Sequence, residues 1–506
     1  MKKHFLQRDY QKTISVYGLV LLVLTVNRII PFRTDPQSFG WSPAQTISGY
    51  SLDDQPPILI ADQNRTVHAF TSEWLSLDSV VSVRRIIYNQ WSLESGWTNP
   101  IDILLSPVKE ARVTDAFLDN KGFIHVVFFG GDYVDADIYY SKAPLEDASN
   151  ARSWSAPIVI GESAGDPENA VFAEDEQGFL YVVYSGRQYG NGVYVVNSKD
   201  GGETWSESTP IFLADSDAPY PYYIHAIKSK SGWLHIVWNV YSVEGQGRGI
   251  YYSRSDDGDK WSDPSLLAYT QDDLGTQTPT IIEYQNELLA IYNLPPKITM
   301  RRSADNGETW QDSVTMFPRH VGVNAALSAV IDSNDVLHLF FGQRIPGAGG
   351  ADIHGMWHSV WANDRWTEPE AIVKGPKIRD LEGYTSFDPN FARAIVSQGN
   401  VILVTWRTDP GSKGNGVWFS YKIIDAPESP VVQLPTLFVD TVAPPEPTLV
   451  EDISIRTPLP SNLPVDDYLL DNSSVSGNIG WIFLGMVLIV ILFIVSVLIT
   501  AKKRYY

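Results

Sequence analysis

A pattern of four short segments recurs seven times between residues 40 and 424, and this repeat limits the fold more than any other feature of the sequence. Its clearest marker is a tryptophan followed by small polar residues, often with a proline soon after. The marker stands at Trp41, Trp97, Trp154, Trp205, Trp261, Trp310 and Trp366, roughly 55 residues apart. Repeats of this length indicate solenoids or propellers.

Each repeat also carries three segments of strand character in a constant order. The middle one is an apolar run, as in residues 124–131, 180–187 and 337–343. A strand that often ends in a Gly, Asn or Asp turn precedes it, an aromatic-rich strand follows it, and the tryptophan then opens a fourth strand. Four strands per repeat predict the blades of an all-β propeller. A parallel β-helix fits poorly because its repeats are shorter.

The two ends of the repeat region are incomplete in a complementary way. The region begins with a lone fourth strand at Trp41 and finishes with strands one to three near Ile424. We therefore expect a seven-bladed β-propeller over residues 40–424, in which the N-terminal strand completes the last blade.

Segments outside the propeller indicate a membrane. Residues 479–500 form an uncharged apolar run, followed by Lys502, Lys503 and Arg504. This predicts a transmembrane helix with a cytoplasmic tail at 501–506. Residues 1–30 combine basic residues with an apolar run and predict a signal peptide or an N-terminal anchor. The proline-rich residues 425–477 predict an extracellular stalk. The expected location is the cell membrane, single-pass, with the propeller outside.

Composition excludes several classes of function. The chain has 38 Lys and Arg against 59 Asp and Glu, a net charge of −21, which argues against nucleic acid as a partner. It has no Cys, which removes disulfides, thiolate metal sites and cysteine nucleophiles, and favours a bacterial surface. The sequence suggests no cofactor, and no motif predicts a metal site.

Three turns between the third and fourth strands share a motif. In two of them Ser, Asp, Gly and Trp follow the order S-x-D-x-G-x-x-W, whereas the third, with Asp256, Gly258 and Trp261, lacks the leading serine. The two full copies comprise Ser198, Asp200, Gly202 and Trp205, and Ser303, Asp305, Gly307 and Trp310. This is the Asp box, in which the carboxylate accepts backbone N–H groups of its own turn and glycine supplies a positive φ.

Through these turns the chain resembles the sialidase-like (BNR-repeat) propeller superfamily. The resemblance implies a ligand face opposite the Asp-box turns. True sialidases have six blades, three arginines for the substrate carboxylate, a Tyr–Glu nucleophile pair and an Asp acid/base. Their first arginine lies in an F/Y-R-I-P motif. Here Arg33 precedes the propeller and the only R-I-P begins at Arg344, in the sixth repeat. The sequence thus departs from the catalytic pattern.

Candidate ligand residues lie in the loops of the face opposite the Asp boxes. Arginines follow the second strand of three repeats and would face acids and tyrosines around the funnel. A polar, aromatic surface of this kind suits a sugar or an acidic group. For any single residue the alternative is an Arg–acid pair in which the two side chains only satisfy each other. The ligand-binding candidates are Arg187, Arg248, Arg344, Arg407, Tyr222 and Glu168. If the chain is a glycosidase, Glu382, Tyr384 and Asp388 are the candidates for catalysis.

The preferred hypothesis is a membrane-anchored extracellular propeller that binds glycans or surface proteins without catalysis. The alternative is a cell-surface exo-glycosidase of sialidase type. A third hypothesis is an assembly factor for another membrane complex. The sequence leaves open the identity of the ligand, catalysis, signal cleavage, oligomeric state and bound calcium.

Overall fold

A computed structural model describes residues 40–432 without 52–54, 77–81, 108–109, 132–135, 162–169, 216–219, 272–274, 321, 325, 347–354, 375–388 and 409–415. The chain divides into two compact units, Met1–Phe438 and Val439–Tyr506, and the described residues all belong to the first. The expected N-terminal segment, transmembrane segment and tail therefore lie outside the described residues, as does the expected stalk beyond residue 432. Within the described residues, no helix is long and apolar enough to cross a membrane.

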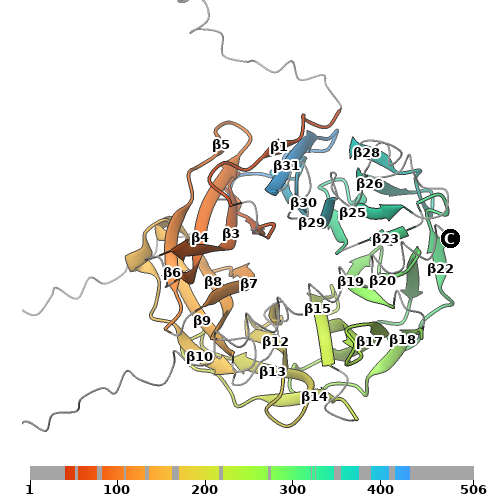
Figure 1. Cartoon of the computed structure of the whole chain (residues 1–506), viewed down its shortest axis with the longest axis horizontal. Helices are drawn as coiled ribbons and strands as arrows, with labels where there is room; N and C mark the ends of the chain where they lie inside the picture. Colours follow the sequence, from red (N-terminus) through yellow and green to blue (C-terminus); the bar gives the residue numbers. More distant parts are fainter. Residues whose placement is uncertain are drawn as a thin grey trace, which may run out of the picture. The chain divides into compact units, whose positions relative to one another are not determined.

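The described residues form seven antiparallel sheets arranged in a ring (Figure 1). Blade one contains β2 (Ile58–Ala61), β3 (Val67–Ser76), β4 (Ser82–Ser92), β5 (Gly96–Trp97) and β6 (Ile101–Leu105); blade two contains β7 (Ala111–Leu118), β8 (Phe123–Gly130), β9 (Asp137–Pro144) and β10 (Ile158–Gly161); blade three contains β11 (Ala170–Glu174), β12 (Leu180–Gly186), β13 (Gly192–Ser198) and β14 (Thr209–Leu213).

The ring continues in the same order through the second half of the chain. Blade four contains β15 (Tyr220–Lys228), β16 (Leu234–Tyr241), β17 (Gly247–Ser255) and β18 (Ser265–Tyr269); blade five contains β19 (Gln277–Tyr284), β20 (Glu287–Leu294), β21 (Lys297–Ser303) and β22 (Val314–Met316); blade six contains β23 (Gly322–Asn324), β24 (Ser328–Ile331), β25 (Leu337–Pro346), β26 (Gly355–Ala362), β27 (Arg365–Trp366) and β28 (Glu370–Lys374); blade seven contains β29 (Pro389–Ser397), β30 (Val401–Thr408), β31 (Gly416–Ile423) and β1 (Gln45–Thr46). Apart from two short 3-10 turns, Leu145–Asp147 and Ala151–Ser153, the described part of the chain is all β and loop.

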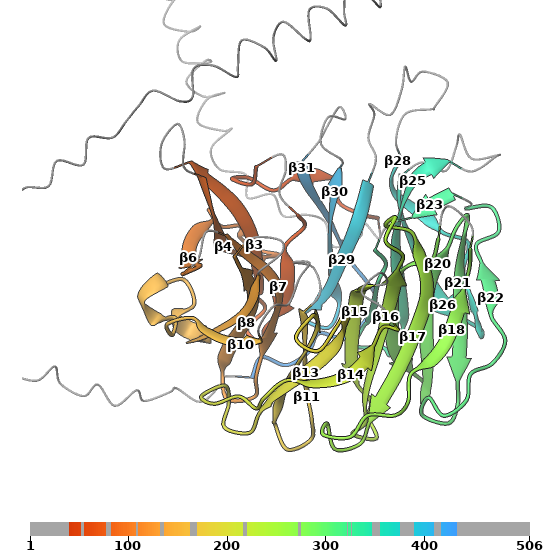
Figure 2. The ribbon, with the colours of Figure 1, turned by 60° about the horizontal axis from the view of Figure 1, so that its bottom comes forward.

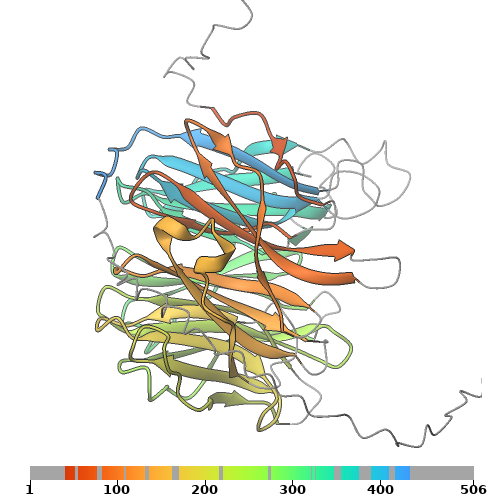
Figure 3. The ribbon, with the colours of Figure 1, turned by 90° about the vertical axis from the view of Figure 1, so that its left-hand side faces the viewer.

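The last blade closes the ring as the sequence predicted. Strand β1 pairs antiparallel with β31, with Gln45 opposite Phe419 and Thr46 opposite Trp418. Figures 2 and 3 show the blue strands of blade seven beside the red start of the described chain. The Trp41 indole donates a hydrogen bond to Glu370 of blade six at 3.0 Å, which ties the N-terminal segment to a second blade. The prediction of a seven-bladed propeller with an N-terminal closing strand is confirmed.

The second strand of most blades is buried on both faces, which explains its continuous apolar sequence. Every residue of β12 is buried, and β8, β16 and β30 are buried at all but one position. Both faces of a blade pack against neighbouring blades, so both faces of the second strand are mainly apolar. Outer strands expose apolar side chains instead, such as Leu105 on β6 and Val314 on β22.

The Asp-box turns of blades three and five have the same hydrogen bonds. Ser198 Oγ donates to Asp200 Oδ1 at 2.8 Å and accepts from the Gly202 N–H at 2.8 Å, while the Thr204 N–H donates to Asp200 Oδ1 at 2.9 Å. Ser303, Asp305, Gly307 and Thr309 repeat this arrangement. Hydrogen bonds from Thr204 and Thr309 lower the pKa of Asp200 and of Asp305 to about 2.

The turn of blade four corrects our reading of its sequence. Its leading serine is present as Ser255, whose hydroxyl donates to Asp257 Oδ1 at 3.2 Å and accepts from the Gly258 N–H at 2.8 Å. The Lys260 N–H donates to Asp257, so Asp257 fills the place that the sequence analysis gave to Asp256. Asp256 is exposed. The turn is one residue shorter than the other two, so Ser255 and Asp257 do not align with the motif in the sequence.

Each full Asp-box turn packs on a tyrosine of the preceding blade. Trp205 of blade three contacts Tyr140 of blade two edge-on, with 5.0 Å between ring centroids, and Trp310 contacts Tyr252 at the same distance. A histidine of the same blade is hydrogen bonded to each tyrosine: His125 Nδ1 lies 2.6 Å from the Tyr140 hydroxyl, and His235 Nδ1 lies 2.7 Å from the Tyr252 hydroxyl. These histidines of the second strands thus orient the tyrosines on which the tryptophan of the next blade packs.

Candidate functional site

The innermost strands of all seven blades surround a central channel that contains a cavity of about 450 Å³. Strands β7, β15, β19 and β29 face the middle of the ring in Figure 1. The cavity is lined mainly by small and apolar side chains, with a few polar groups that include Asp115, His225 and Arg393. A concave space with few polar groups is typical of a ligand site.

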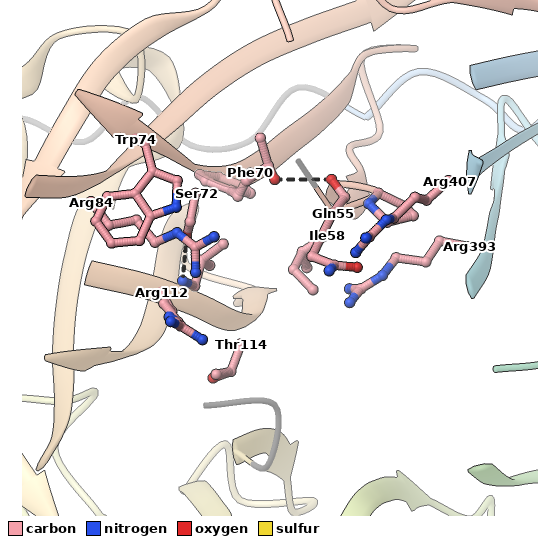
Figure 4. Close-up of a pocket in the computed structure, with 13 residues that line it drawn as sticks. Gln55, Ile58, Phe70, Ser72, Trp74, Arg84, Arg112, Thr114, Arg393 and Arg407 are labelled. Carbon is pink, nitrogen blue, oxygen red and sulfur yellow. Dashed lines mark hydrogen bonds between the residues drawn. The ribbon is translucent and has the colours of Figure 1, made fainter. Parts of the chain in front are cut away.

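A second cavity of about 340 Å³ opens between blades one, two and seven, and four arginines line it. We call it the arginine pocket. Its lining comprises Gln55, Pro56, Ile58, Phe70, Thr71, Ser72, Trp74, Arg84, Arg112, Val113, Thr114, Arg393 and Arg407. Figure 4 shows Arg84 and Arg112 on one side of the pocket and Arg393 and Arg407 on the other.

Strand pairing explains how arginines from separate repeats meet. Arg84 and Trp74 are directly opposite each other on β4 and β3, and the guanidinium lies 5.0 Å from the ring centroid. Arg393 and Arg407 come from the adjacent strands β29 and β30 of blade seven. The Val113 N–H of β7 donates to Ser72 Oγ of β3 at 2.7 Å, which brings Arg112 to the wall formed by blade one.

The pocket is strongly cationic in its described lining. Arg112 forms an ion pair with Glu110 at 2.9 Å, but Glu110 itself is not part of the lining. Among the described lining residues there is no carboxylate, histidine or tyrosine. The Nε of Arg407 is buried and has no hydrogen-bond partner among the described residues. A buried N–H of this kind is costly unless a partner is supplied.

Asp115 stands in the channel beside the arginine pocket. Burial raises its pKa to about 6, although two backbone N–H groups, those of Phe172 and Ala116, and the charge of Arg393 favour the ionised form. Its carboxylate accepts from the Ala116 N–H at 2.9 Å and from the Phe172 N–H at 2.8 Å. Burial also lowers the pKa of His225 to about 4, so this imidazole is neutral at physiological pH.

Of the three chosen arginines whose side chains the structure describes, one lies in the pocket and two do not. Arg407 lines it, whereas Arg187 is exposed after β12 and Arg248 on β17 is hydrogen bonded to Gln246. Tyr222 on β15 lines neither cavity, but its neighbour Tyr223 lines the channel. Outside the described residues lie Glu168, Glu382, Tyr384, Asp388 and the side chain of Arg344.

Strand position explains why the sequence pointed to other arginines. Arg187, Arg344 and Arg407 were chosen because each follows the second strand of its repeat. The arginine pocket instead takes Arg112 and Arg393 from the first strands β7 and β29, and Arg84 from the third strand β4. Blades two and seven flank blade one in the closed ring, and this neighbourhood is the signal that could have found Arg112 and Arg393.

Known proteins are similar to this chain in fold alone. No family model and no curated protein matches the chain. Solved structures similar to it include an ulvan lyase at 13% identity (76% of this chain, 97% of that chain, TM-score 0.49), a sialidase from Streptococcus pneumoniae at 14% (76% and 70%, 0.40) and the Trypanosoma rangeli sialidase at 12% (76% and 59%, 0.40). The seven blades and hydrogen-bonded Asp-box turns of this chain form a sialidase-like propeller fold.

Proposed function

We propose that this chain is a membrane-anchored extracellular module that binds an acidic glycan in the arginine pocket without chemically altering it. The observation that supports the proposal most strongly is the convergence of Arg84, Arg112, Arg393 and Arg407 on one cavity. The terminal apolar segments and the proline-rich region of the sequence support the anchor and the stalk.

The chemistry of the pocket suits a carboxylated or sulfated sugar. A guanidinium presents two parallel N–H groups that match the oxygens of a carboxylate or sulfate. Arg407 brings one such guanidinium to the lining of the pocket. Trp74, 44% exposed, offers an aromatic face beside the cations on which the apolar side of a sugar ring packs.

Binding without catalysis is the proposal that we prefer to hydrolysis. Glycoside hydrolysis needs an acid and a base or nucleophile on the two sides of the bond. The described residues of the arginine pocket supply neither, and the neighbouring channel supplies one carboxylate, Asp115. The exo-glycosidase alternative depends on Glu382, Tyr384 and Asp388 and remains a prediction from the sequence.

A glycan array tests the proposal with the full-length chain in detergent micelles. The array carries carboxylated, sulfated and neutral glycans, and both retention of protein and loss of terminal sugars are read. We expect retention on acidic glycans only, with no trimming, and a loss of at least about tenfold in affinity for Arg407→Ala.

The matched control is Arg187→Ala, which removes an exposed arginine outside both cavities. We expect it to bind like the wild type. Equal retention of neutral glycans, or an Arg407→Ala protein that binds as well as the wild type, would contradict binding in this pocket. Trimming of terminal sugars would make the chain an enzyme.

A further inference from the structure

The arginine pocket and the central channel adjoin each other. Gln55, Ile58, Thr114 and Arg393 line both cavities. Gln55 is fixed at this junction by its carbonyl oxygen, which accepts a hydrogen bond from the Thr71 hydroxyl at 3.0 Å (Figure 4). A ligand anchored by the arginines therefore has open space next to it in the channel.

Three innermost strands carry the same β-bulge at the channel wall. In β15, β19 and β29 the pairing register shifts so that two residues face one on the neighbouring strand. The first residue of each bulge is Tyr223, Thr278 or Phe391, with φ of 50°, 46° and 50°. All three residues line the channel cavity. Bulges of this kind re-aim side chains and are frequent beside functional sites.

The bulges cost backbone energy, since positive φ is unfavourable for bulky side chains. Such conformations persist where the surroundings enforce them and gather at ligand sites. Here two of the three bulges aim aromatic rings into the channel. The rings of Tyr223 from blade four and Phe391 from blade seven lie 6.5 Å apart between centroids, with 35° between their planes. Blades that are not neighbours thus build one aromatic surface.

The aromatic pair lies close to the arginines along the chain. Phe391 precedes Arg393 by two residues in the bulged part of β29, and both residues line the channel cavity. The apolar face of a sugar ring packs well on an aromatic ring.

We infer that the channel is a second subsite, so that the ligand is an acidic oligosaccharide of two or more units. This inference rests on the proposed function: the anionic unit lies in the arginine pocket and the adjoining unit stacks on Tyr223 and Phe391. The two cavities of about 340 and 450 Å³ each lie at the low end of the range for ligand pockets, roughly 300–1,000 Å³, and together they accommodate a longer ligand.

Calorimetric titration of the full-length chain with ligands of two lengths tests the inference. The probes are sialic acid against sialyllactose, and glucuronic acid against a hyaluronan tetrasaccharide. We expect one of the longer probes to bind wild-type protein at least about tenfold more tightly than its own acidic monosaccharide. In a Tyr223→Asn/Phe391→Asn variant that advantage falls to about twofold or less, while affinity for the monosaccharide is unchanged.

Asparagine is chosen because it tolerates positive φ and removes the ring without changing the backbone. Phe391→Leu, which keeps bulk and loses the aromatic face, is the second variant and guards against a folding defect. Tyr269→Asn, on the exposed outer strand β18, is the matched control and should retain the full advantage.

The outcomes separate this inference from the proposed function. An acidic monosaccharide that binds with no gain for the longer probe overturns the second subsite alone, as does a gain that survives in the Asn and Leu variants. Absence of binding by every acidic probe overturns the arginine pocket as well as the second subsite.

Discussion

The glycines of the Asp-box turns are required by a contact between blades as well as by their own backbone. A Cβ on Gly202 would lie 1.8 Å from the Tyr140 hydroxyl, and one on Gly307 would lie 1.7 Å from that of Tyr252. Both glycines have positive φ, 88° and 82°. Because glycine has no Cβ, each turn can close onto the tyrosine of the preceding blade.

We predict that Gly202→Ala lowers the free energy of unfolding by at least about 3 kcal/mol, because strain at positive φ adds to overpacking against Tyr140. Gly96→Ala is the control. Gly96 also has positive φ, 69°, but a Cβ added there would meet no described atom within 4 Å. It should cost only about 1–2 kcal/mol. Urea denaturation measures both; equal losses would show that the contact with Tyr140 contributes nothing.

We predict that Asp115 makes the proposed anion binding depend on pH. Its pKa is raised to about 6 by burial, so above pH 6 a negative charge lies near Arg393 and opposes an anionic ligand. Below pH 6 the carboxyl is protonated and this opposition is lost. Affinity for sialyllactose should rise about two- to fivefold between pH 7.5 and pH 5. His225 stays neutral over this range because its pKa is lowered to about 4.

The variant Asp115→Asn separates this effect from other titrations. It should bind at pH 7.5 as tightly as the wild type does at pH 5, and its affinity should be flat between the two, measured by calorimetry. By linkage, a bound anion should in turn raise the pKa of Asp115. Wild-type affinity that does not change with pH would show that Asp115 does not act on the ligand.

At the scale of elements, the sequence predicts strands and blades well and side-chain direction at the channel poorly. The second strands are recognisable because burial on both faces leaves them apolar throughout, as in β12. The bulges of β15 and β29 leave no such trace: one extra residue reverses the alternation of faces, and neither Tyr223 nor Phe391 is a glycine or proline that would mark it. The Asp257 turn was misaligned for a similar reason, a deletion of one residue.

The N-terminal segment is held by a polar network as well as by β1. Glu370 of β28 accepts from the Trp41 indole at 3.0 Å and contacts His358 at 2.8 Å and Lys422 at 2.7 Å. The hydrogen bond with His358, followed by those with Lys422 and Trp41, lowers the pKa of Glu370 to about 2. A lowered carboxyl pKa stabilises the fold above the unfolded value near 4.5, and this stabilisation is lost as pH falls toward 2.

Glu370→Gln should therefore reduce the free energy of unfolding at pH 7 by about 1 kcal/mol, the modest size expected for a partly exposed network. The difference from wild type should shrink as pH falls from about 4.5 toward 2. Glu428→Gln is the control, since Glu428 pairs with Arg65 on the surface at 2.7 Å and should change stability little at any pH. Urea melts at several pH values give the comparison; a constant difference would contradict the role of the charge.

At the scale of the whole molecule, the sequence predicts a propeller on a stalk above a membrane. Protease treatment of intact cells should release a soluble propeller whose new C-terminus, found by mass spectrometry, lies within residues 425–477. A chain lacking residues 479–506 should be secreted into the medium. Recovery of the full-length chain from membranes by a high-salt wash without detergent would show that residues 479–500 do not span the bilayer.

The closing strand gives the ring a mechanical weak point. Eight residue pairs join β30 to β31, whereas two join β31 to β1, with backbone hydrogen bonds from Ser42 and Ile47 at either end of the pairing. The chain enters and leaves the propeller through this one blade, so tension between its ends acts on that short pairing. When the two ends of the chain are pulled apart, the pairing of β1 with β31 should break first. The closed ring then opens, while the other six blades stay intact. A propeller closed in this way yields at a defined place when its two ends are pulled apart.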